Sequence, residues 1–374
     1  MINISNKCIG CGACQSKCNL KCISMDRVNG QYLPILNQQS CVGCNQCEEV
    51  CVATNAGQLE FNRAINSYYG YAVIDKERLS SSSGGVFYAV AKSFIDEGGI
   101  VVGAAFDESF KVQHIIAEKK EDLVRLQGSK YVESELNSVY RKVEELLKSG
   151  KKVLFSGVPC QIGAIKMYLR KNYDNLYTCE VFCHGAPRSG IFDAYIKWIG
   201  EKKGKITGFN FRSKRNGWAD PTYEIKTETG NIIQKHKNNV YHLLFGKHVS
   251  LRDSCFECQF RQEERVSDLS LGDFWGIEKY YPHVQTRNGV SAIIVSTSKG
   301  QDLLDSSQIY LSKCKVDEIY DKNAWMVKRY EKPTEQDKVI NDFVTLNGQD
   351  FFRKYEIQYK YKDRIKRIFE RFIK

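Results

Sequence analysis

The sequence Cys8-Ile-Gly-Cys-Gly-Ala-Cys-Gln-Ser-Lys-Cys18 is followed by a second run of the same spacing, Cys41-Val-Gly-Cys-Asn-Gln-Cys-Glu-Glu-Val-Cys51. Every cysteine of the second run lies the same number of residues after its counterpart in the first. Between the runs, the turn residues Asn29-Gly30 precede the strand-like stretch 31–36, so the insert is expected to be a small β element and not a linker. The repeat therefore predicts a small α+β module built around two matched sets of cysteines.

The spacing C-x-x-C-x-x-C-x-x-x-C is that of bacterial ferredoxins, in which three close thiolates bind one 4Fe-4S cluster and the fourth binds the other cluster. On this pattern, the first cluster takes Cys8, Cys11, Cys14 and Cys51, and the second takes Cys41, Cys44, Cys47 and Cys18. Glycines beside the ligands allow backbone amides to approach the cluster sulfurs. We therefore expect residues 1–65 to form an α+β ferredoxin-like module with two 4Fe-4S clusters.

The module departs from the ferredoxin pattern at two positions. Asn19 and Val52 follow the fourth cysteines, where ferredoxins place proline, which loosens a turn but removes no ligand. Zinc is the alternative metal because it also binds four thiolates, although its sites use two separated C-x-x-C pairs. A further cysteine, Cys22, is expected to be buried packing and not a ligand.

The composition predicts a globular chain of two or three domains. Of the 374 residues, 42% are hydrophobic and 26% are charged, values that exclude a disordered chain. We find no apolar stretch typical of a signal peptide, and no apolar run approaches the roughly 20 residues of a membrane-spanning helix. An odd number of cysteines, 15, in tight C-x-x-C spacing favours metal binding in a reducing compartment over disulfides. We therefore expect a cytoplasmic protein without a transmembrane segment.

The net charge of +11 can attract nucleic acid, an anionic membrane, an acidic protein or a phosphorylated coenzyme. The positive residues are scattered and form no single stripe, so no nucleic-acid partner is expected. Residues 353–374 form a basic C-terminal tail with apolar residues at helical spacing: Ile365, Ile368, Phe369 and Phe372. We expect a helix docked on its own domain, and a membrane-surface or nucleic-acid-binding role for the tail is the alternative.

From residue 66 the chain alternates between strand-like and helical patterns, which predicts a larger mixed α/β domain over residues 66–352. The expected helices cover 86–96 and 134–148, with another beginning near Gln161. The expected strands cover 71–74, 99–106, 152–155, 176–182, 206–211, 222–227 and 292–296.

Four cysteines of this larger domain stand in turn-like segments. Cys160 lies between a strand and the start of a helix, where the helix N-terminus would lower its pKa. Cys183 follows the next strand, and Cys255 and Cys258 form a C-x-x-C pair. Loops at the carboxyl ends of neighbouring parallel strands meet in one crevice, so the four thiolates are expected to form a third metal site. The alternative is that Cys160 is a reactive thiol and the other three cysteines are structural.

Other polar stretches predict a cofactor site. Ser80-Ser-Ser-Ser-Gly-Gly-Val opens a helix whose free amides can receive a phosphate or a flavin edge, although an ordinary serine cap would explain it too. Lys130 lies in a turn between helical segments. His184 and Asp273 are candidates for proton handling.

Seven ordered motifs resemble the beta subunit family of coenzyme F420 hydrogenases and dehydrogenases. They are SSSGG (81–85), GSKY (128–131), GVPCQ (157–161), CHG (183–185), FRSKRNGW (211–218), RDSCFECQF (252–260) and DLSLGDFWG (268–276). With the ferredoxin-like module, the resemblance covers roughly residues 1–300. The family also includes chlorophyll-intermediate reductases and bacterial members that occur with polysaccharide biosynthesis genes.

The resemblance implies an FAD-binding domain that carries its own 4Fe-4S cluster, held by Cys160, Cys183, Cys255 and Cys258. It places the flavin near Ser82, Ser83, Gly84, Gly85, Ser129 and Lys130. The expected function is an iron-sulfur flavoprotein oxidoreductase, with hydride exchange between FAD and a deazaflavin or other organic partner. Electrons would then pass through the clusters to or from a ferredoxin-like carrier. The alternative is a non-catalytic electron-wiring subunit of a larger oxidoreductase complex.

Overall fold

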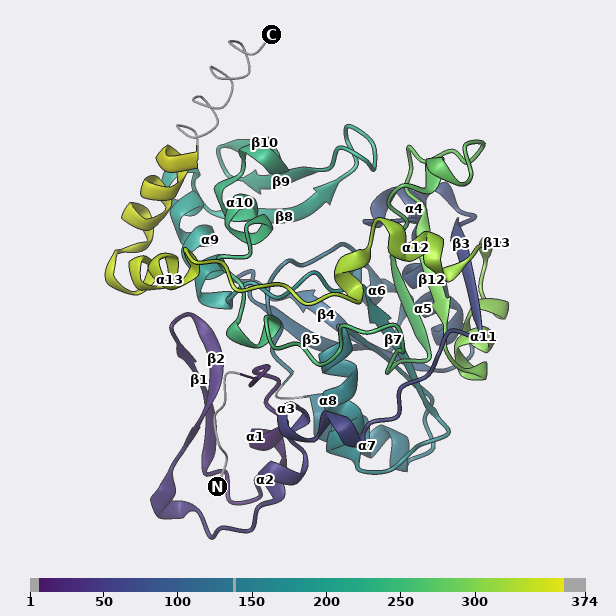
Figure 1. The fold of residues 1–374 in the computed structure, drawn as a ribbon, viewed down its shortest axis with the longest axis horizontal. Helices are drawn as coiled ribbons and strands as arrows, with labels where there is room; N and C mark the ends of the chain where they lie inside the picture. Colours follow the sequence, from purple (N-terminus) through teal and green to yellow (C-terminus); the bar gives the residue numbers. More distant parts are fainter. Residues whose placement is uncertain (1–6, 137–138, 360–374) are drawn as a thin grey trace.

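The computed structural model describes residues 7–136 and 139–359 (Figure 1). Its first part contains the hairpin β1 (Ile23–Val28) and β2 (Gln31–Leu36), which pair in antiparallel fashion. The turn residues Asn29 and Gly30 have φ values of 51° and 79°, and two residues with positive φ are what a tight type I′ hairpin turn requires. This hairpin confirms the β element expected between the two cysteine runs.

Short helices begin within or directly after the two cysteine runs. They are α1 (Ala13–Lys17), α2 (Gln46–Glu49) and α3 (Val52–Asn55). Ala13, Val50 and Val52 are buried, and they pack in one core with residues of the larger domain. The cysteine-rich segment is therefore seated on the rest of the molecule through apolar contacts.

The larger part of the chain is built on a mixed sheet, which has eight strands among the described residues. Their order is β13 (Ile309–Lys313), β3 (Asn66–Ala72), β12 (Ser291–Val295), β11 (Leu269–Asp273), β7 (Leu176–Val181), β6 (Val153–Gly157), β4 (Ile100–Phe106) and β5 (Val112–Ala117). The four central strands β11, β7, β6 and β4 are parallel, and the outer pairs are antiparallel. This sheet confirms the expected mixed α/β domain.

Helices cover both faces of this sheet. One face packs against α4 (Asp75–Ser80), α5 (Val86–Asp96), α6 (Lys120–Leu126) and α11 (Ser298–Asp305), and the other packs against α7 (Val139–Lys148) and α8 (Pro159–Leu169). Side chains alternate between the faces, as a strand requires: Val153 and Phe155 lie in the core with α7 and α8, whereas Leu154 lies in the core with α5. The cysteine-rich module packs on α7 and α8, so it lies on one side of the sheet.

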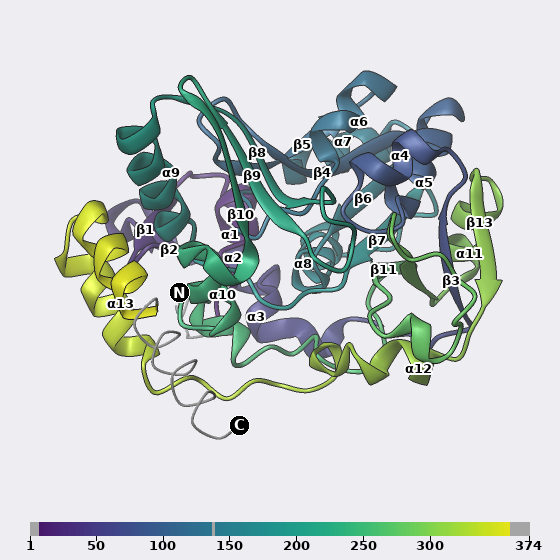
Figure 2. The same cartoon turned by 90° about the horizontal axis from the view of Figure 1, so that it is seen from above.

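A smaller antiparallel sheet lies beside the large one (Figures 1 and 2). Its strands among the described residues are β8 (Ile206–Ser213), β9 (Thr222–Thr227) and β10 (Gly230–Lys235). The helices α9 (Ser189–Lys203), α10 (Val240–Gly246) and α13 (Gln336–Thr345) accompany it, and α12 (Val316–Asp321) precedes α13 near the large sheet. Aromatic side chains such as Phe192, Phe211 and Tyr241 fill the core between this sheet and its helices.

The C-terminal segment is helical over residues 348–359. Phe351, Phe352, Tyr355 and Tyr359 are buried in the same aromatic core. The boundary expected at residue 353 therefore falls inside a packed helix. The apolar residues expected at helical spacing from Ile365 onward lie outside the described residues.

Most of the expected strands and helices are present, and two are displaced. The strand expected over 71–74 is β3, which ends at Ala72. The helix expected from 134 onward is α7, which begins at Val139, because Glu135 forms backbone hydrogen bonds with Val112 and His114 of β5 and is held extended. In the part of the chain that the structure describes, no helix has the length and apolar character needed to cross a membrane.

Candidate functional site

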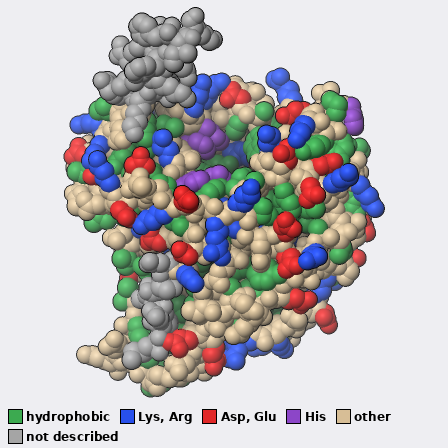
Figure 3. Space-filling view, viewed as in Figure 1, with side chains coloured by type: hydrophobic (Ala, Val, Ile, Leu, Met, Phe, Trp, Pro, Cys, Tyr) green, Lys and Arg blue, Asp and Glu red, His purple; other side chains and the backbone are tan. Residues whose placement is uncertain are grey.

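A cavity of about 920 Å³ lies at the carboxyl ends of the parallel strands. Residues that follow β6, β7 and β11 line it, among them Pro159, Phe182 and Asp273. Arg212 and His236, from the smaller sheet and the segment after it, form another wall. Figure 3 shows His side chains in a hollow near the top of this face, with Lys and Arg around it. The crevice beyond the carboxyl ends of parallel strands is the usual ligand position in such folds.

Four cysteines from separate segments meet on the wall of this cavity. Cys160 lies in the first turn of α8, Cys183 follows β7, and Cys255 and Cys258 lie in the segment after α10. Electrostatic interactions with the other three cysteines all act on the Cys160 thiol. The four cysteines are partly exposed, because they face the interior of the cavity. The four residues expected to form a third metal site are thus close together.

Burial raises the pKa of three of these thiols, those of Cys160, Cys183 and Cys255. The pKa of Cys160 is well above its ordinary value because of burial and the neighbouring thiols Cys183, Cys258 and Cys255. Burial and the same kind of neighbours raise the pKa of Cys183 to about 12. The expectation that the helix N-terminus would lower the pKa of Cys160 is wrong, since burial and like neighbours outweigh the helix dipole. A free reactive thiolate is therefore disfavoured, whereas a bound metal would displace these protons.

Donors and cations surround this group of thiols. The backbone N–H of Ala186 donates to Cys255 Sγ at 3.3 Å. Burial raises the pKa of Cys255, while Ala186, Arg252 and Arg261 oppose that rise. Amide donors and positive charge near the sulfurs are what an anionic iron-sulfur cluster requires of its surroundings.

The four cysteines expected to bind the first cluster, Cys8, Cys11, Cys14 and Cys51, also lie close together. Burial raises the pKa of Cys14, and Cys11, Cys8 and Cys51 raise it further. Cys11 in turn acts on Cys160. The expected ligands of the first cluster therefore lie next to the cysteine group of the cavity.

The second expected set lies farther out in the module. Cys44 is exposed, and its neighbour Cys47 is half-buried. Cys18 Sγ lies 3.2 Å from Cys22 Sγ, and Cys41 also interacts with Cys22. Cys22 is buried as expected, but its sulfur contacts the ligand candidates.

The spacing of these cysteine sets bears on the choice between zinc and a cluster. Among the described residues, no group of three or more His, Cys, Asp or Glu side chains is arranged to hold a metal ion. One tetrahedral zinc ion needs its sulfurs about 3.8 Å apart. The ligands of a 4Fe-4S cluster each bind a different iron, so they stand further apart.

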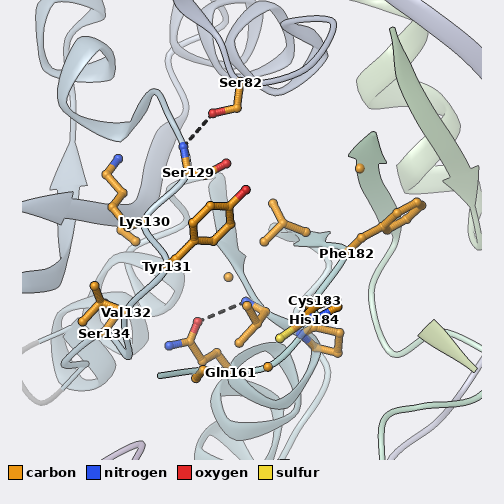
Figure 4. A pocket seen from close by; sticks show the side chains of 18 of the residues that line it. Ser82, Ser129, Lys130, Tyr131, Val132, Ser134, Gln161, Phe182, Cys183 and His184 are labelled. Carbon is orange, nitrogen blue, oxygen red and sulfur yellow. Dashed lines mark hydrogen bonds between the residues drawn. The ribbon is translucent and has the colours of Figure 1, made fainter. Parts of the chain in front are cut away.

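The serine-glycine motif and the GSKY motif meet on the cavity wall. Ser82 Oγ accepts a hydrogen bond of 2.8 Å from the backbone N–H of Ser129 (Figure 4). Ser83 instead donates to the carbonyl of Val290 at 3.1 Å, and Gly84 donates to Ser291 Oγ at 3.0 Å. Ser82 and Ser129 therefore face the cavity, while Ser83 and Gly84 fasten the loop to the sheet.

Gly85 serves the backbone of this loop. It precedes α5 with a φ of 85°, a left-handed conformation that favours glycine. A Cβ atom there would lie 3.1 Å from Arg78 Cα and 3.2 Å from Ala72 Cβ. Gly85 is thus required by the turn itself.

Lys130 of the GSKY motif and Lys214 of the FRSKRNGW motif each donate hydrogen bonds to backbone carbonyls of neighbouring segments. Lys130 Nζ donates to the last carbonyls of α6, at distances of 2.9 to 3.1 Å, and burial lowers its pKa to about 7. Lys214 Nζ donates to the carbonyls of Arg78 at 2.6 Å, Asn288 at 2.7 Å and Ser83. Lys214 was not among the expected site residues, although it stands in the FRSKRNGW motif.

The two candidates for proton handling are both engaged in contacts. His184 Nε2 lies 2.9 Å from His248 Nε2, and the Tyr330 hydroxyl lies 3.0 Å from His184 Nδ1. Burial, followed by His248 and Arg261, lowers the pKa of His184 to about 4, so its ring is neutral at pH 7.

Asp273 belongs to a cluster at the end of β11. Its carboxylate forms a buried ion pair with Arg212 and accepts a hydrogen bond of 2.6 Å from Trp218 Nε1. Trp218 stacks on Trp275 with ring centroids 4.6 Å apart. These contacts join two motifs across the cavity wall and give each oxygen of Asp273 one hydrogen-bond partner.

An α/β fold that gathers cysteines and a serine-rich helix start around one cavity is typical of a redox protein. The family model for the coenzyme F420 hydrogenase/dehydrogenase beta subunit N-terminal region matches residues 67–141, and that for its C-terminal region matches residues 150–318. The chain belongs to this family, as the seven motifs predicted. No curated protein matches it.

One solved structure with a similar fold is a chain of the F420-reducing NiFe hydrogenase complex from Methanosarcina barkeri. The match has a TM-score of 0.50 and 15% sequence identity, and it covers 75% of this chain and 93% of that chain. The likeness concerns the fold.

Proposed function

We propose that this protein is an iron-sulfur flavoprotein oxidoreductase. The observation that carries the proposal is that four cysteines and the Ser82–Ser129 contact line one cavity. FAD supplies two-electron hydride chemistry, and 4Fe-4S clusters carry electrons singly to or from a ferredoxin-like carrier. The chain itself binds and orients these groups.

The residues present fit FAD. The cavity volume of about 920 Å³ is near the upper end of the roughly 300–1,000 Å³ of small-molecule sites. The helix α5 begins at the cavity wall, and the positive end of a helix dipole favours a phosphate group. Ser82 and Ser129 would hold the polar part of the cofactor there.

The residues present also fit a third 4Fe-4S cluster. Cys160, Cys183, Cys255 and Cys258 would be its ligands, and the N–H of Ala186 would donate to one of its thiolates. The electrostatic contact between Cys160 and Cys11 supports a path from the cavity to the ferredoxin-like module. The module would hold two further clusters on its eight repeated cysteines.

Basic side chains in the cavity lining support an anionic organic partner. Arg212, Lys235 and Lys237 line the cavity, and Arg212 and Lys235 are paired there with Asp273 and Asp220. His236 and His242 belong to the same lining. Burial lowers the pKa of both histidines, with a further contribution from Arg212 at His236 and from His236 and His184 at His242. A deazaflavin coenzyme is a partner of this chemical class, and the family name makes it the first substrate to assay.

Anaerobic purification followed by iron, sulfide and flavin determination tests the proposal. We expect bound FAD whose absorbance bleaches on reduction. The variant Ser129→Glu should lower flavin content, because its carboxylate would lie where the cofactor phosphates bind, whereas Ser306→Glu, at an exposed position, should not. Clusters without flavin after reconstitution would instead indicate the non-catalytic electron-wiring subunit.

A further inference from the structure

The second expected ligand set lies at the outer edge of the molecule. Cys44 is exposed, and it belongs to the segment between β2 and α2, which forms the lower edge in Figure 1. The cavity cysteines lie inside the larger domain. Of the three expected ligand sets in the described part of the chain, this one has the exposed cysteine, Cys44.

Three large apolar side chains near this set in the sequence are exposed. Leu20, Ile35 and Val42, here called the outer patch, are 54%, 42% and 74% exposed. Leu20 lies between Cys18 and Cys22, Val42 follows Cys41, and Ile35 lies in β2. Residues 28–47 contain no Lys, Arg, Asp or Glu, although 26% of the chain is charged. Depletion of charge around exposed apolar side chains is typical of the core of a protein interface.

Arg27 and Glu48 border this uncharged stretch, and two lysines lie near the fourth ligand of the set. Lys17 and Lys21 lie on either side of Cys18, and Lys21 is exposed. The chain as a whole carries a net charge of +11. A positive protein steers an acidic partner toward it, and the rate of such an encounter falls with ionic strength.

We propose that the outer patch is the docking surface for the one-electron carrier, and that this carrier is an acidic protein. The inference rests on the proposed function, because it requires a cluster held by Cys18, Cys41, Cys44 and Cys47. The carrier covers Val42 and Leu20, and the uncharged segment forms the centre of the contact. Docking at this edge brings the carrier next to the outermost ligand set.

The variant Val42→Glu tests this surface, and Leu20→Glu gives a second, independent change. Val124→Glu is the matched control, since Val124 is 62% exposed on α6, which packs on the other face of the sheet from the module. The probe is an acidic two-cluster bacterial ferredoxin, and calorimetry on the anaerobically purified protein measures its Kd. Iron and sulfide contents are measured for each variant.

We expect Val42→Glu and Leu20→Glu to raise the Kd about tenfold, as the loss of one buried apolar contact at the centre of an interface would do. Val124→Glu should leave the Kd unchanged, and added salt should weaken wild-type binding. Equal Kd values for all variants would overturn the proposal. A wild-type protein that dimerises, with Val42→Glu dissociating the dimer, would also overturn it, because the outer patch would then bind a second copy of the chain. Wild-type protein without iron would overturn the proposed function instead.

Discussion

One buried guanidinium joins the module to the larger domain, and its removal is the sharpest test of that junction. Arg252 is 2% exposed and lies in the segment that carries Cys255. Its Nη1 pairs with Glu133 at 2.5 Å, and its Nη2 donates to the carbonyls of Cys8 and Tyr32, both at 3.0 Å. Arg252→Met would leave the carboxylate of Glu133 without its cation and the two carbonyls without their donor.

The size of the effect follows from burial. Removing one partner of a buried ion pair costs about 3–5 kcal/mol. Each carbonyl left without a donor adds about 1–2 kcal/mol, but the contributions of one network are not additive. We therefore expect Arg252→Met to lower the free energy of unfolding by about 4 kcal/mol. The backbone N–H of Tyr32 still donates to Glu133, at 2.8 Å, which limits the loss.

The matched control is the exposed pair between Arg170 and Glu49. This pair also joins the larger domain to the module, but its side chains are 52% and 47% exposed. Arg170→Met should therefore lower the free energy of unfolding by at most about 1 kcal/mol. Urea unfolding of the anaerobically purified variants measures both values, and iron content reports on the first cluster. Equal unfolding midpoints for the two variants would refute the reasoning that Arg252 fastens the module.

Three further predictions concern the larger domain. Lys214→Met should lower the flavin content and should lower the free energy of unfolding by about 2–3 kcal/mol, because three carbonyls lose a charged donor. Lys226→Met, at an exposed position of β9, should change neither quantity. His114 is buried and its pKa is lowered to about 4, below its unfolded value of about 6.5. The folded state should therefore lose roughly 3 kcal/mol as pH falls from 6.5 to 4, and a thermal unfolding series should show this loss in the wild type but not in His114→Gln. A chain that ends at Phe352 lacks Tyr355 and Tyr359, whose side chains are 2% and 9% exposed. Its free energy of unfolding should be at least about 3 kcal/mol lower than that of a chain that ends at Tyr359. Equal unfolding curves for the two chains would contradict this.

The sequence predicts local structure well where a local rule decides it. Asn29-Gly30 predicts the tight hairpin because both residues accept positive φ. The pattern of apolar residues predicts the helix over 86–96, which is α5 with the same bounds. The motifs predict the family, and the parallel order of β6 and β7 brings Cys160 and Cys183 to one edge.

Properties that depend on three-dimensional surroundings were not predictable. The pKa of Cys160 depends on burial and on thiols from other segments, so its helix position alone gave the wrong direction. Lys214 looks like a surface lysine in the sequence, because the carbonyls it binds come from two distant parts of the chain, 78–83 and Asn288. The extended conformation of Glu135 depends on pairing with β5, which overrides its helical pattern.

The iron and acid-labile sulfide content of the anaerobically reconstituted protein tests the central claim most directly. Three 4Fe-4S clusters correspond to about twelve irons and twelve sulfides per chain, and the cysteines Cys160, Cys183, Cys255 and Cys258 account for four of each. Cys258→Ser should therefore reduce the content to about eight, while Cys314→Ser, which changes a cysteine outside the three sets, should leave it at about twelve. Zinc in place of iron, or the same iron content in Cys258→Ser as in the wild type, would contradict the account.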